Sequence, residues 1–416
     1  MDIKALLHNK TLRNGSLFSA FSFFGKGVSF LIVLLLAGFL EPEEYGNLSL
    51  FNTIVSLATF LMAFSTGGYI SVSFFNSSKE SFSKDFSSIL IWSISSVVLL
   101  SLLIAICQLF SVRLPLEYRY VWTGLFIAFF VFIFNLHQDI LRVQEKVVKY
   151  GVFNCSNAIL NLITCFFLVG YLKYGWDGRV YSYLFCAAIY AIVSTILFIK
   201  EGLINLHIDK ERLINVLKWG VPLIPHSISS WLRAGADQNI INSYYGTYDV
   251  GVFGFALNLM SIIVTIGIAF NSSNSVSIFQ ILSSNESHKK NKLRRQTKLL
   301  LGVYLIMTLL VVLLATIIVR LWYTKYIGSL NYFYILSVMG FLQCVYFLFC
   351  NYLFYYSKTK ELMFITFGSS LLHLILSLIF TRYSLYYTCV IYVVVQLLIV
   401  VCVYQRSAKL IKVNLV

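Results

Sequence analysis

The residues of this sequence best suited to chemistry are charged side chains placed inside long apolar stretches. Lys26 lies near the middle of the apolar stretch 15–40, and Arg233 lies inside the apolar stretch 219–244. A charge at the centre of a membrane-spanning helix costs about 2.5–3.5 kcal/mol on insertion, so it is kept only where it has water, a partner or a task. The two cations are therefore candidate ligands for an anionic substrate inside a helical bundle. For Lys26 the alternative is a lysine whose long side chain reaches the membrane surface.

The stretch that contains Arg233 holds further polar and helix-bending residues. Asp237 follows Arg233 by four positions, a spacing at which the two side chains can pair on one helix face. The sequence thus predicts either a substrate-binding pair or a purely structural ion pair. Pro222 and Pro225 open the same stretch, and proline removes a backbone hydrogen bond and bends a helix. We expect a hinge at these prolines, with a static kink as the alternative.

A second polar group, formed by Gln138, Asp139 and Arg142, ends the fourth apolar stretch. We take these three residues as further candidates for substrate binding, with a solvated helix end as the alternative. His137 and His373 lie in apolar surroundings. There a hydrogen-bonded core histidine is favoured over a proton relay, although histidine can serve as either.

The sequence contains no pattern typical of an enzyme, a nucleotide site or a metal site. The motifs G-x-x-x-x-G-K-[ST] and H-E-x-x-H are missing. All eight cysteines fall inside apolar stretches without metal-ligand spacing, as expected of small packing residues. We therefore expect no cofactor, no metal and no catalytic residue. Energy for any transport must then come from a proton or sodium gradient, the membrane potential or the substrate gradient.

The composition indicates the kind of structure that holds these charged residues in place. The chain of 416 residues is 59% hydrophobic and only 12% charged, whereas soluble domains carry roughly 25% charged residues. Ten uncharged runs are each long enough to cross a membrane as a helix, and the two stretches that hold Lys26 and Arg233 add two more. The runs lack the alternation of barrel strands, so we predict an all-α polytopic membrane protein of about twelve spanning helices. The ten runs lie between Glu44 and Lys79, Asp85 and Arg113, Arg119 and Asp139, Lys149 and Lys173, Arg179 and Lys200, Asp249 and Glu286, Lys298 and Arg320, Lys325 and Lys358, Glu361 and Arg382, and Arg382 and Arg406.

The distribution of basic residues predicts the orientation of these helices. If the N-terminus is cytoplasmic, most of the 32 lysines and arginines fall in cytoplasmic segments, which is the positive-inside pattern. Both termini are therefore expected in the cytoplasm. The net charge of +15 is explained by this topology and by anionic membrane lipids, so no nucleic-acid partner is expected.

The two halves of the chain resemble each other weakly. Gly46 and Gly251 lie in similar connections between two apolar helices, 205 positions apart. Six predicted helices separate the copies, so both halves point the same way, as in transporters built from parallel repeats. We expect bundles at 1–200 and 218–416 joined by a cytoplasmic linker at 201–217. In this alignment Lys26 falls within two positions of Arg233, which predicts one cation from each half in a shared cavity.

Four short segments, which occupy only two helical hairpins, carry a family resemblance that in length, helix count and topology covers nearly the whole chain. They are EPEEYG at 41–46, WGVPLIP at 219–225, AD at 236–237 and DVGVF at 249–253. With the helix count and topology, they resemble the polysaccharide-transport branch of the MOP exporter superfamily, the Wzx-type flippases of O-antigen and capsule repeat units. Asp237 matches the acidic position of that family in its seventh helix. Gln238 stands where a basic residue often follows that aspartate in the family.

The resemblance implies a MATE-like fold of two six-helix bundles around a central, cation-lined cavity that opens alternately to each side of the membrane. It implies a substrate of undecaprenyl diphosphate carrying an oligosaccharide, moved across a bacterial inner membrane. Its partners would be that lipid, the surrounding membrane lipids, and the polymerase and chain-length proteins of the same pathway. The alternatives are a drug/ion antiporter of the same superfamily, a membrane polysaccharide polymerase or a non-catalytic assembly protein.

Overall fold

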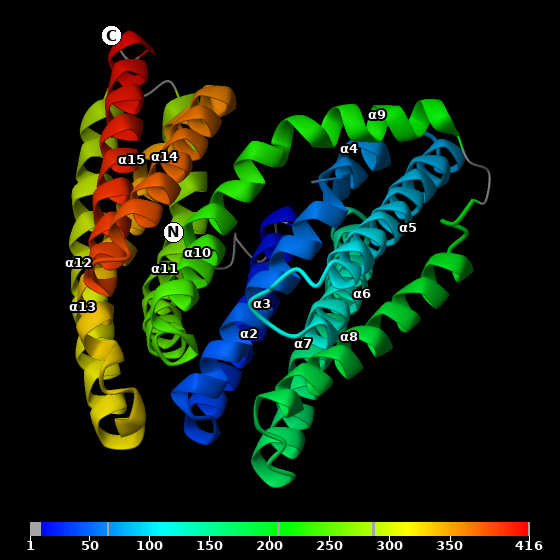
Figure 1. Ribbon diagram of the computed structural model, residues 1–416. Helices are drawn as coiled ribbons and strands as arrows, with labels where there is room; N and C mark the ends of the chain where they lie inside the picture. Colours follow the sequence, from blue (N-terminus) through cyan, green and yellow to red (C-terminus); the bar gives the residue numbers. More distant parts are fainter. Residues whose placement is uncertain (1–9, 65, 206–208, 285–287, 415–416) are drawn as a thin grey trace. The chain divides into compact units, whose positions relative to one another are not determined.

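Every regular element in the described part of the chain is a helix (Figure 1). The computed structural model describes residues 10–64, 66–205, 209–284 and 288–414. The elements are α2 (Lys10–Phe39), α3 (Pro42–Ala63), η1 (Thr66–Gly68), α4 (Tyr69–Asn76), α5 (Lys79–Leu109), α6 (Tyr118–Val143), α7 (Val147–Cys165), η2 (Phe166–Tyr171), α8 (Gly175–Lys200), α9 (Lys210–Gly220), η3 (Val221–Leu223), α10 (Ile224–Tyr245), α11 (Thr247–Ser283), α12 (Lys289–Trp322), η4 (Thr324–Tyr326), α13 (Ser329–Tyr355), α14 (Thr359–Phe380) and α15 (Leu385–Asn414).

The long helices coincide with the predicted membrane spans. Among the described residues, 11 helices are long and apolar enough to cross a membrane. The twelfth expected span is α10, whose sequence includes Arg233, Asp237 and several serine, asparagine and glutamine residues. These polar residues lower its hydropathy, which accounts for its absence from the eleven. The all-α polytopic fold predicted from the sequence is confirmed.

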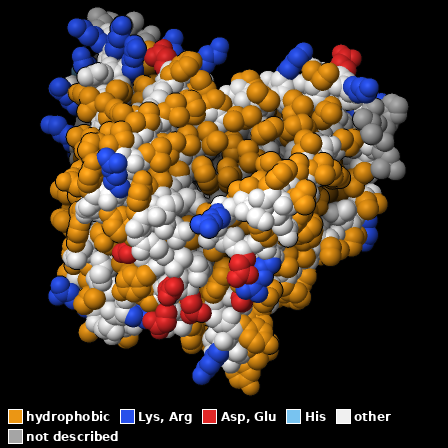
Figure 2. Space-filling view, viewed as in Figure 1, with side chains coloured by type: hydrophobic (Ala, Val, Ile, Leu, Met, Phe, Trp, Pro, Cys, Tyr) orange, Lys and Arg blue, Asp and Glu red, His pale blue; other side chains and the backbone are white. Residues whose placement is uncertain are grey.

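Large apolar side chains are exposed along the outer faces of the spanning helices. Leu99 and Leu103 on α5 are more than half exposed, and so are Leu309 and Leu313 on α12. Figure 2 shows hydrophobic side chains over much of the visible face. Such continuous apolar surface would be costly in water, and it fits a protein whose solvent is lipid.

The chain forms two compact units whose boundaries differ from the expected bundles. Unit 1 comprises residues 1–40 and 47–227, and unit 2 comprises residues 41–46 and 228–416. The segment 201–227 therefore belongs with the first unit, where a linker and the start of the second bundle were expected. The first turn of α3 belongs to the second unit.

Each unit has its own core. In unit 1, Phe86 of α5, Leu136 of α6 and Phe198 of α8 are buried together with Val216 of α9. This packing explains why α9 belongs to unit 1. In unit 2, α13 packs against both α11 and α15, and Leu353 of α13 lies in the core there. The burial of apolar side chains between neighbouring helices holds each unit together.

Two glycines allow the backbones of α3 and α11 to touch within unit 2. A Cβ atom on Gly46 would collide with the carbonyl oxygen of Thr247, and one on Gly251 would collide with that of Pro42. Such close approach of two backbones requires residues without a side chain. These are the glycines that occupy equivalent positions in the predicted repeat, so the two copies of the repeat meet at their matching residues.

The predicted seventh helix is interrupted. The sequence suggested one helix over 219–244, but α9 ends at Gly220, the 3-10 helix η3 follows, and α10 begins at Ile224. Pro222 lies in η3 and Pro225 in the first turn of α10, where a missing backbone N–H costs little. The prolines thus mark a break between two helices, and their role as a hinge stays a prediction.

Candidate functional site

Lys26 lies exposed on α2, and its ammonium group is 5.9 Å from the centre of the Phe23 ring. Among the described residues it has no acidic partner. One turn earlier on the same face, the hydroxyl of Ser22 is 2.8 Å from the hydroxyl of Tyr150 on α7. This contact helps to fix the position of α2 on α7. The cation is therefore carried on a packed helix but remains available to a ligand.

Asp139 and Arg142 pair at the end of α6. Arg142 Nη1 donates to Asp139 Oδ1 at 2.9 Å, and the side chains are 53% and 31% exposed, respectively. The guanidinium group also lies 5.6 Å from the centre of the Tyr150 ring. Tyr150 therefore contacts both Arg142 and the helix that carries Lys26. An exposed pair of this kind contributes little to stability and leaves its charges accessible.

Gln138 is separated from this pair. Its side chain is buried, and neither Nε2 nor Oε1 has a hydrogen-bond partner among the described residues. The predicted polar group at the end of α6 is therefore divided, with Asp139 and Arg142 at the surface and Gln138 inside unit 1. Neighbouring positions on a helix point about 100° apart, which accounts for the division.

Unit 1 also contains an open groove of about 480 Å³ that the sequence did not reveal. Ser56 and Thr59 of α3, Tyr183 of α8 and Ser227 at the start of α10 supply hydroxyl groups to its lining. Tyr183 lies beside Arg179, whose guanidinium carbon is 5.0 Å from the ring centre. The groove combines apolar walls with hydroxyl groups, a lining suited to a ligand that is partly polar.

The charged residues of α10 do not pair with each other as the sequence suggested. Asp237 Oδ2 instead lies 2.7 Å from Nε2 of His373 on α14, and both side chains are fully buried. Arg233 Nη1 donates to Oε1 of Gln396 on α15 at 3.2 Å. The Tyr392 hydroxyl donates to the backbone carbonyl of Arg233 at 2.6 Å. Packing of α14 and α15 against α10 provides partners that are better placed than a neighbour on the same helix.

His373 and Gln396 are thus two site residues that the sequence analysis did not select. Each is a polar residue within an uncharged apolar run, and this is the signal that could have identified them. The expectation of a hydrogen-bonded histidine in the core is confirmed for His373. It also holds for His137, which is buried and lies 3.2 Å from the Ser194 hydroxyl.

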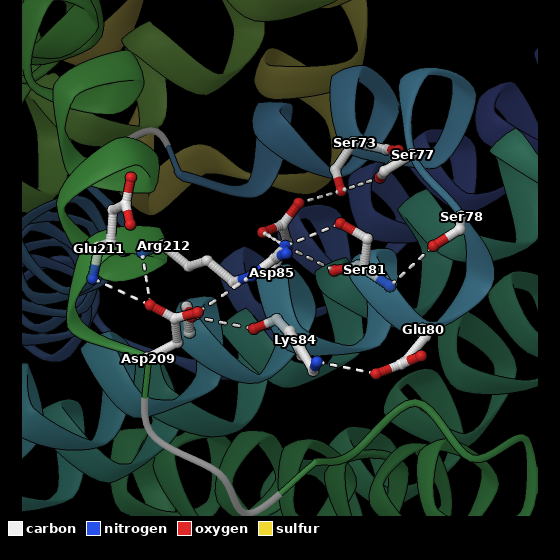
Figure 3. Close-up of polar contacts among 11 residues, drawn as sticks. Ser73, Ser77, Ser78, Glu80, Ser81, Lys84, Asp85, Asp209, Glu211 and Arg212 are labelled. Atoms are coloured by element: carbon white, nitrogen blue, oxygen red, sulfur yellow. Dashed lines mark hydrogen bonds and ion pairs between the residues drawn. The ribbon is translucent and has the colours of Figure 1, made fainter.

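A network in unit 1 anchors α9 to α5 and α4 (Figure 3). Arg212 Nη1 donates to Asp85 Oδ1 at 2.8 Å and to the carbonyl and hydroxyl oxygens of Ser81. The other oxygen of Asp85 accepts a hydrogen bond from Ser73 at 2.6 Å. The bond to Asp85 raises the pKa of Arg212 above its already high value. Asp209 accepts from the backbone N–H groups of Arg212 and Glu211 at the start of α9, which lowers the pKa of its carboxyl group.

A second polar contact outside the spans joins the ends of α6 and α8. Lys146 donates to Glu201 at 2.9 Å, and Gln144 donates to the same carboxylate at 3.2 Å. Burial acts to raise the pKa of Glu201, but these hydrogen bonds outweigh it and hold the pKa below its usual value. Glu201 therefore remains charged near neutral pH.

Metal ligands do not cluster in the described part of the chain. Within residues 10–64, 66–205, 209–284 and 288–414, no group of three or more histidine, cysteine, aspartate or glutamate side chains could hold a metal ion. The sites described above are therefore built from single cations, hydroxyl groups and one buried acid–histidine pair.

Comparison with solved structures defines the class. The chain is similar to the lipid II flippase MurJ in an inward closed conformation, with a TM-score of 0.72 and 16% identity over 94% of this chain and 87% of that one. It is also similar to an inward-facing multidrug resistance MATE family transporter of the MOP superfamily, with a TM-score of 0.71 and 14% identity over 92% and 95%. The protein is a multi-pass membrane protein with the fold of the MOP superfamily.

Sequence comparison then identifies the family. The profile of the polysaccharide biosynthesis protein family matches residues 11–279, and the MatE profile matches residues 222–379. A curated relative, Lsg locus putative protein 1 of Haemophilus influenzae, is 24% identical over 350 residues, covering 80% of this chain and 82% of that protein. The chain belongs to the polysaccharide biosynthesis protein family, and the resemblance noted in its sequence is confirmed.

Proposed function

We propose that the protein is a flippase for oligosaccharide repeat units carried on undecaprenyl diphosphate. It moves them from the cytoplasmic to the outer leaflet of a bacterial inner membrane, with both of its own termini in the cytoplasm. The family match over residues 11–279 carries this proposal. The likeness in fold to MurJ, which is named a lipid II flippase, supports a lipid-linked substrate.

The exposed cation on α2 suits the charged part of such a substrate. A diphosphate and its sugars cannot cross hydrocarbon unaided, because removing water from charged and polar groups costs several kcal/mol or more per group. Lys26 offers a point charge to the diphosphate, and Arg233 offers a planar donor group that fits phosphate oxygens. The groove lined by Ser56, Thr59 and Tyr183 offers hydroxyl groups and an aromatic ring to the sugars.

Residues near the end of α6 suit the first contact with the substrate. Asp139 and Arg142 are accessible, and the positive-inside pattern places this end of α6 at the cytoplasmic surface. The break at Pro222 and Pro225 offers a place for bending during transport. The polymerase and chain-length proteins of the same pathway are the expected partners on the outer face, and proton or sodium coupling is the expected source of energy.

One observation favours a second candidate, a MATE-like drug/ion antiporter. The MatE profile matches residues 222–379, a segment that includes Asp237 and His373. A drug antiporter would bind an organic cation, for which acidic residues are needed in the binding site. The exposed cation Lys26 opposes that substrate class, so the flippase is the better supported function.

Deletion of the gene in its native bacterium tests the proposal. We expect surface polysaccharide to disappear and single undecaprenyl-linked repeat units to accumulate on the cytoplasmic leaflet. The wild-type gene should restore export, whereas Lys26→Ala should restore less than a tenth of it at equal expression. Lys84→Ala is the matched control, because Lys84 is engaged by Glu80 at 2.8 Å outside the proposed path; it should restore export fully.

Two outcomes would contradict the proposal. If single repeat units reach the outer leaflet of the deletion strain and only polymer is missing, the protein acts after translocation, as a polymerase does. If surface polysaccharide is unchanged and sensitivity to cationic drugs rises instead, the antiporter is the correct assignment.

A further inference from the structure

Arg179, near the start of α8, is a cation of unit 1 that the proposed function leaves without a task. Its Nη1 atom donates to Oδ1 of Asn161 on α7 at 2.6 Å and to the hydroxyl of Ser182 at 3.3 Å. Among the described residues it forms no ion pair, and neither Nε nor Nη2 donates to an oxygen atom. Asn161 and Ser182 are neutral, so they hold the positive charge of Arg179 in a fixed place without neutralising it.

The Arg179 side chain points in the direction opposite to that expected near the end of a membrane span. Such an arginine normally extends to the nearby membrane surface, where its charge is hydrated. Gly175 begins α8 only four positions earlier, yet the guanidinium carbon lies 5.0 Å from the ring centre of Tyr183, one turn deeper in the span. Its partner Asn161 is more than two turns from Tyr171 at the end of η2. Joining α7 to α8 does not require this charge, because a neutral glutamine can also donate to Asn161.

Asn161 is the last member of a stripe of amide side chains on α7. Asn154, Asn157 and Asn161 follow one another at spacings of three and four residues, which place them on one face of the helix. Asn157 is partly exposed and has no hydrogen-bond partner among the described residues. Polar side chains inside a membrane span usually face the bundle interior or a water-filled cavity. The stripe can therefore offer its amide groups to a polar ligand in place of water.

Asn154 relates this stripe to Lys26. Its Nδ2 atom donates to the carbonyl oxygen of Phe21 on α2 at 2.9 Å, and a Cβ atom on Gly25 would lie 3.0 Å from the same nitrogen. Lys26 is the next residue of α2, so its exposed side chain leaves the helix beside this contact. Asn161 lies seven residues further along α7, a rise of about 10 Å. The stripe thus leads from the neighbourhood of Lys26 to Arg179 within unit 1.

We propose that Arg179 and Asn161 form a second binding site for the diphosphate group, which receives it from Lys26 before release on the outer side. This inference rests on the proposed function, because it takes the diphosphate as ligand and Lys26 as its earlier contact. The positive-inside pattern places the α7–α8 connection outside, so Arg179 is the later of the two cations. Its planar donor group fits two phosphate oxygens at once, and the amide of Asn157 donates to them on the way. Tyr183 lines the hydroxyl-bearing groove of unit 1, so a diphosphate at Arg179 brings the attached sugars beside that groove.

The test follows the reaction of a thiol placed on the stripe, in the purified full-length protein in micelles. Asn157→Cys puts this thiol one turn from Asn161, and a charged maleimide measures its accessibility after the labelling of the native cysteines is subtracted. Inorganic pyrophosphate is the probe, because it is the diphosphate group without lipid or sugar. At about ten times its Kd, pyrophosphate should slow the labelling about tenfold, since only the unoccupied protein reacts. This protection should persist when Lys26→Ala is added and should be lost when Arg179→Gln is added.

Three further variants serve as controls. Val148→Cys lies nine positions before Asn157, on the opposite side of α7, and Val148 is 71% exposed; its labelling should not respond to pyrophosphate. Arg113→Gln removes an exposed arginine from the connection between α5 and α6, and protection should remain. Arg179→Lys guards against failure to fold, because it keeps the charge. It should retain protection with a Kd up to about tenfold higher, since an ammonium group lacks the planar fork.

The outcomes separate this inference from the proposed function. Labelling at position 157 that pyrophosphate does not slow overturns the second site and leaves the flippase intact. Protection that persists in Arg179→Gln, or that depends on Lys26 alone, overturns it as well. If deletion of the gene leaves surface polysaccharide unchanged, the proposed function fails instead, and the labelling experiment still decides whether Arg179 binds a diphosphate.

Discussion

Unit 1 and unit 2 each bury an aspartate beside a basic partner from another helix, and the two sites differ in how well they are satisfied. Asp85 in unit 1 has both oxygens hydrogen-bonded, one by Arg212 and one by Ser73. Asp237 in unit 2 has one oxygen bonded to His373, and its other oxygen has no hydrogen-bond partner among the residues that the structure describes. The partner also differs, because the guanidinium group of Arg212 offers several N–H donors in a fixed plane whereas the imidazole ring of His373 offers fewer.

We call the Asp85–Arg212 network the clamp, because both oxygens of Asp85 are hydrogen-bonded, in contrast to the partly bonded Asp237–His373 pair. A fully hydrogen-bonded network in a place of low dielectric constant rigidifies the helices that it joins. The Asp85–Arg212 network has this character, and it holds α9 on α5. The Asp237–His373 pair is joined by one hydrogen bond, so it holds its two helices together less firmly. The burial of an acid therefore does not by itself indicate function; the number of its oxygens left unpaired is the better guide.

The largest effect on stability should follow removal of the clamp's cation. Arg212→Ala leaves Asp85 buried without its charged partner, and loss of one member of a buried pair typically costs 3–5 kcal/mol. Because Arg212 is 29% exposed, we expect about 3 kcal/mol. This loss in the free energy of unfolding can be measured by unfolding the protein in mixed micelles with a rising fraction of SDS.

The control for this variant is Arg119→Ala, which breaks the exposed pair of Arg119 with Glu117. Exposed pairs contribute little, so stability should be unchanged. An Arg212→Ala protein as stable as the Arg119→Ala protein would show that α9 is held by its apolar packing alone.

A smaller effect is expected when the charge is kept and the shape is changed. Besides Asp85 and Ser81, the Arg212 guanidinium group contacts Asp209, with Nε 3.2 Å from Oδ2. Arg212→Lys retains the attraction to Asp85, but one compact ammonium group cannot reach all three partners. We expect a loss of about 1 kcal/mol, equivalent to one or two hydrogen bonds, in the same unfolding measurement. A loss as large as that of Arg212→Ala would mean that donor geometry, rather than charge, carries the clamp.

The acidic cap of α9 should make the clamp weakly sensitive to low pH. Hydrogen bonds lower the pKa of Asp209 in the folded state, so its contribution is present above the unfolded pKa of about 3.9 and is lost as pH falls through the lower, folded value. Unfolding midpoints measured from pH 6 downward should decline less steeply in Asp209→Asn than in wild type. If the unfolding midpoints of both proteins decline equally steeply with falling pH, Asp209 does not contribute to the stability of the clamp.

The smallest change in stability is expected in unit 2. Asp237→Asn keeps an oxygen that can accept a hydrogen bond from His373 Nε2, so the hydrogen bond of the pair is retained. Its free energy of unfolding should lie within about 1 kcal/mol of the wild-type value. A loss comparable to that of Arg212→Ala would make the pair a second clamp and remove the contrast between the units.

The sequence allowed prediction of the helices far better than of the partners within the site. Long uncharged runs identify spans because every backbone polar group in lipid must be satisfied within a helix, and the structure agrees. The pairing of Arg233 with Asp237 was wrong because His373 lies 136 positions further on and reaches Asp237 only through packing of α14. No local spacing could indicate that contact.

The clamp escaped prediction for a related reason. Asp85 and Arg212 are 127 positions apart, and each looked like an ordinary charge at the end of a helix. The N-terminal signal of α9 was nevertheless present, since Asp209 is a preferred residue before a first helical turn. That signal could have shown that the expected linker contains a helix, although not what the helix packs against.

The six residues Glu41–Gly46 have a consequence for how the protein is made. They belong to unit 2 although they lie near the start of the 416-residue chain, and Tyr45 packs there against Phe255 and Tyr326. Domains tend to fold in the order of their synthesis, yet this segment leaves the ribosome long before the helices that receive it. Unit 2 therefore cannot complete its packing from residues 228–416 alone, because it also needs the segment 41–46, which is synthesised much earlier. A gene cut between the units would yield a second piece that lacks part of its own interior.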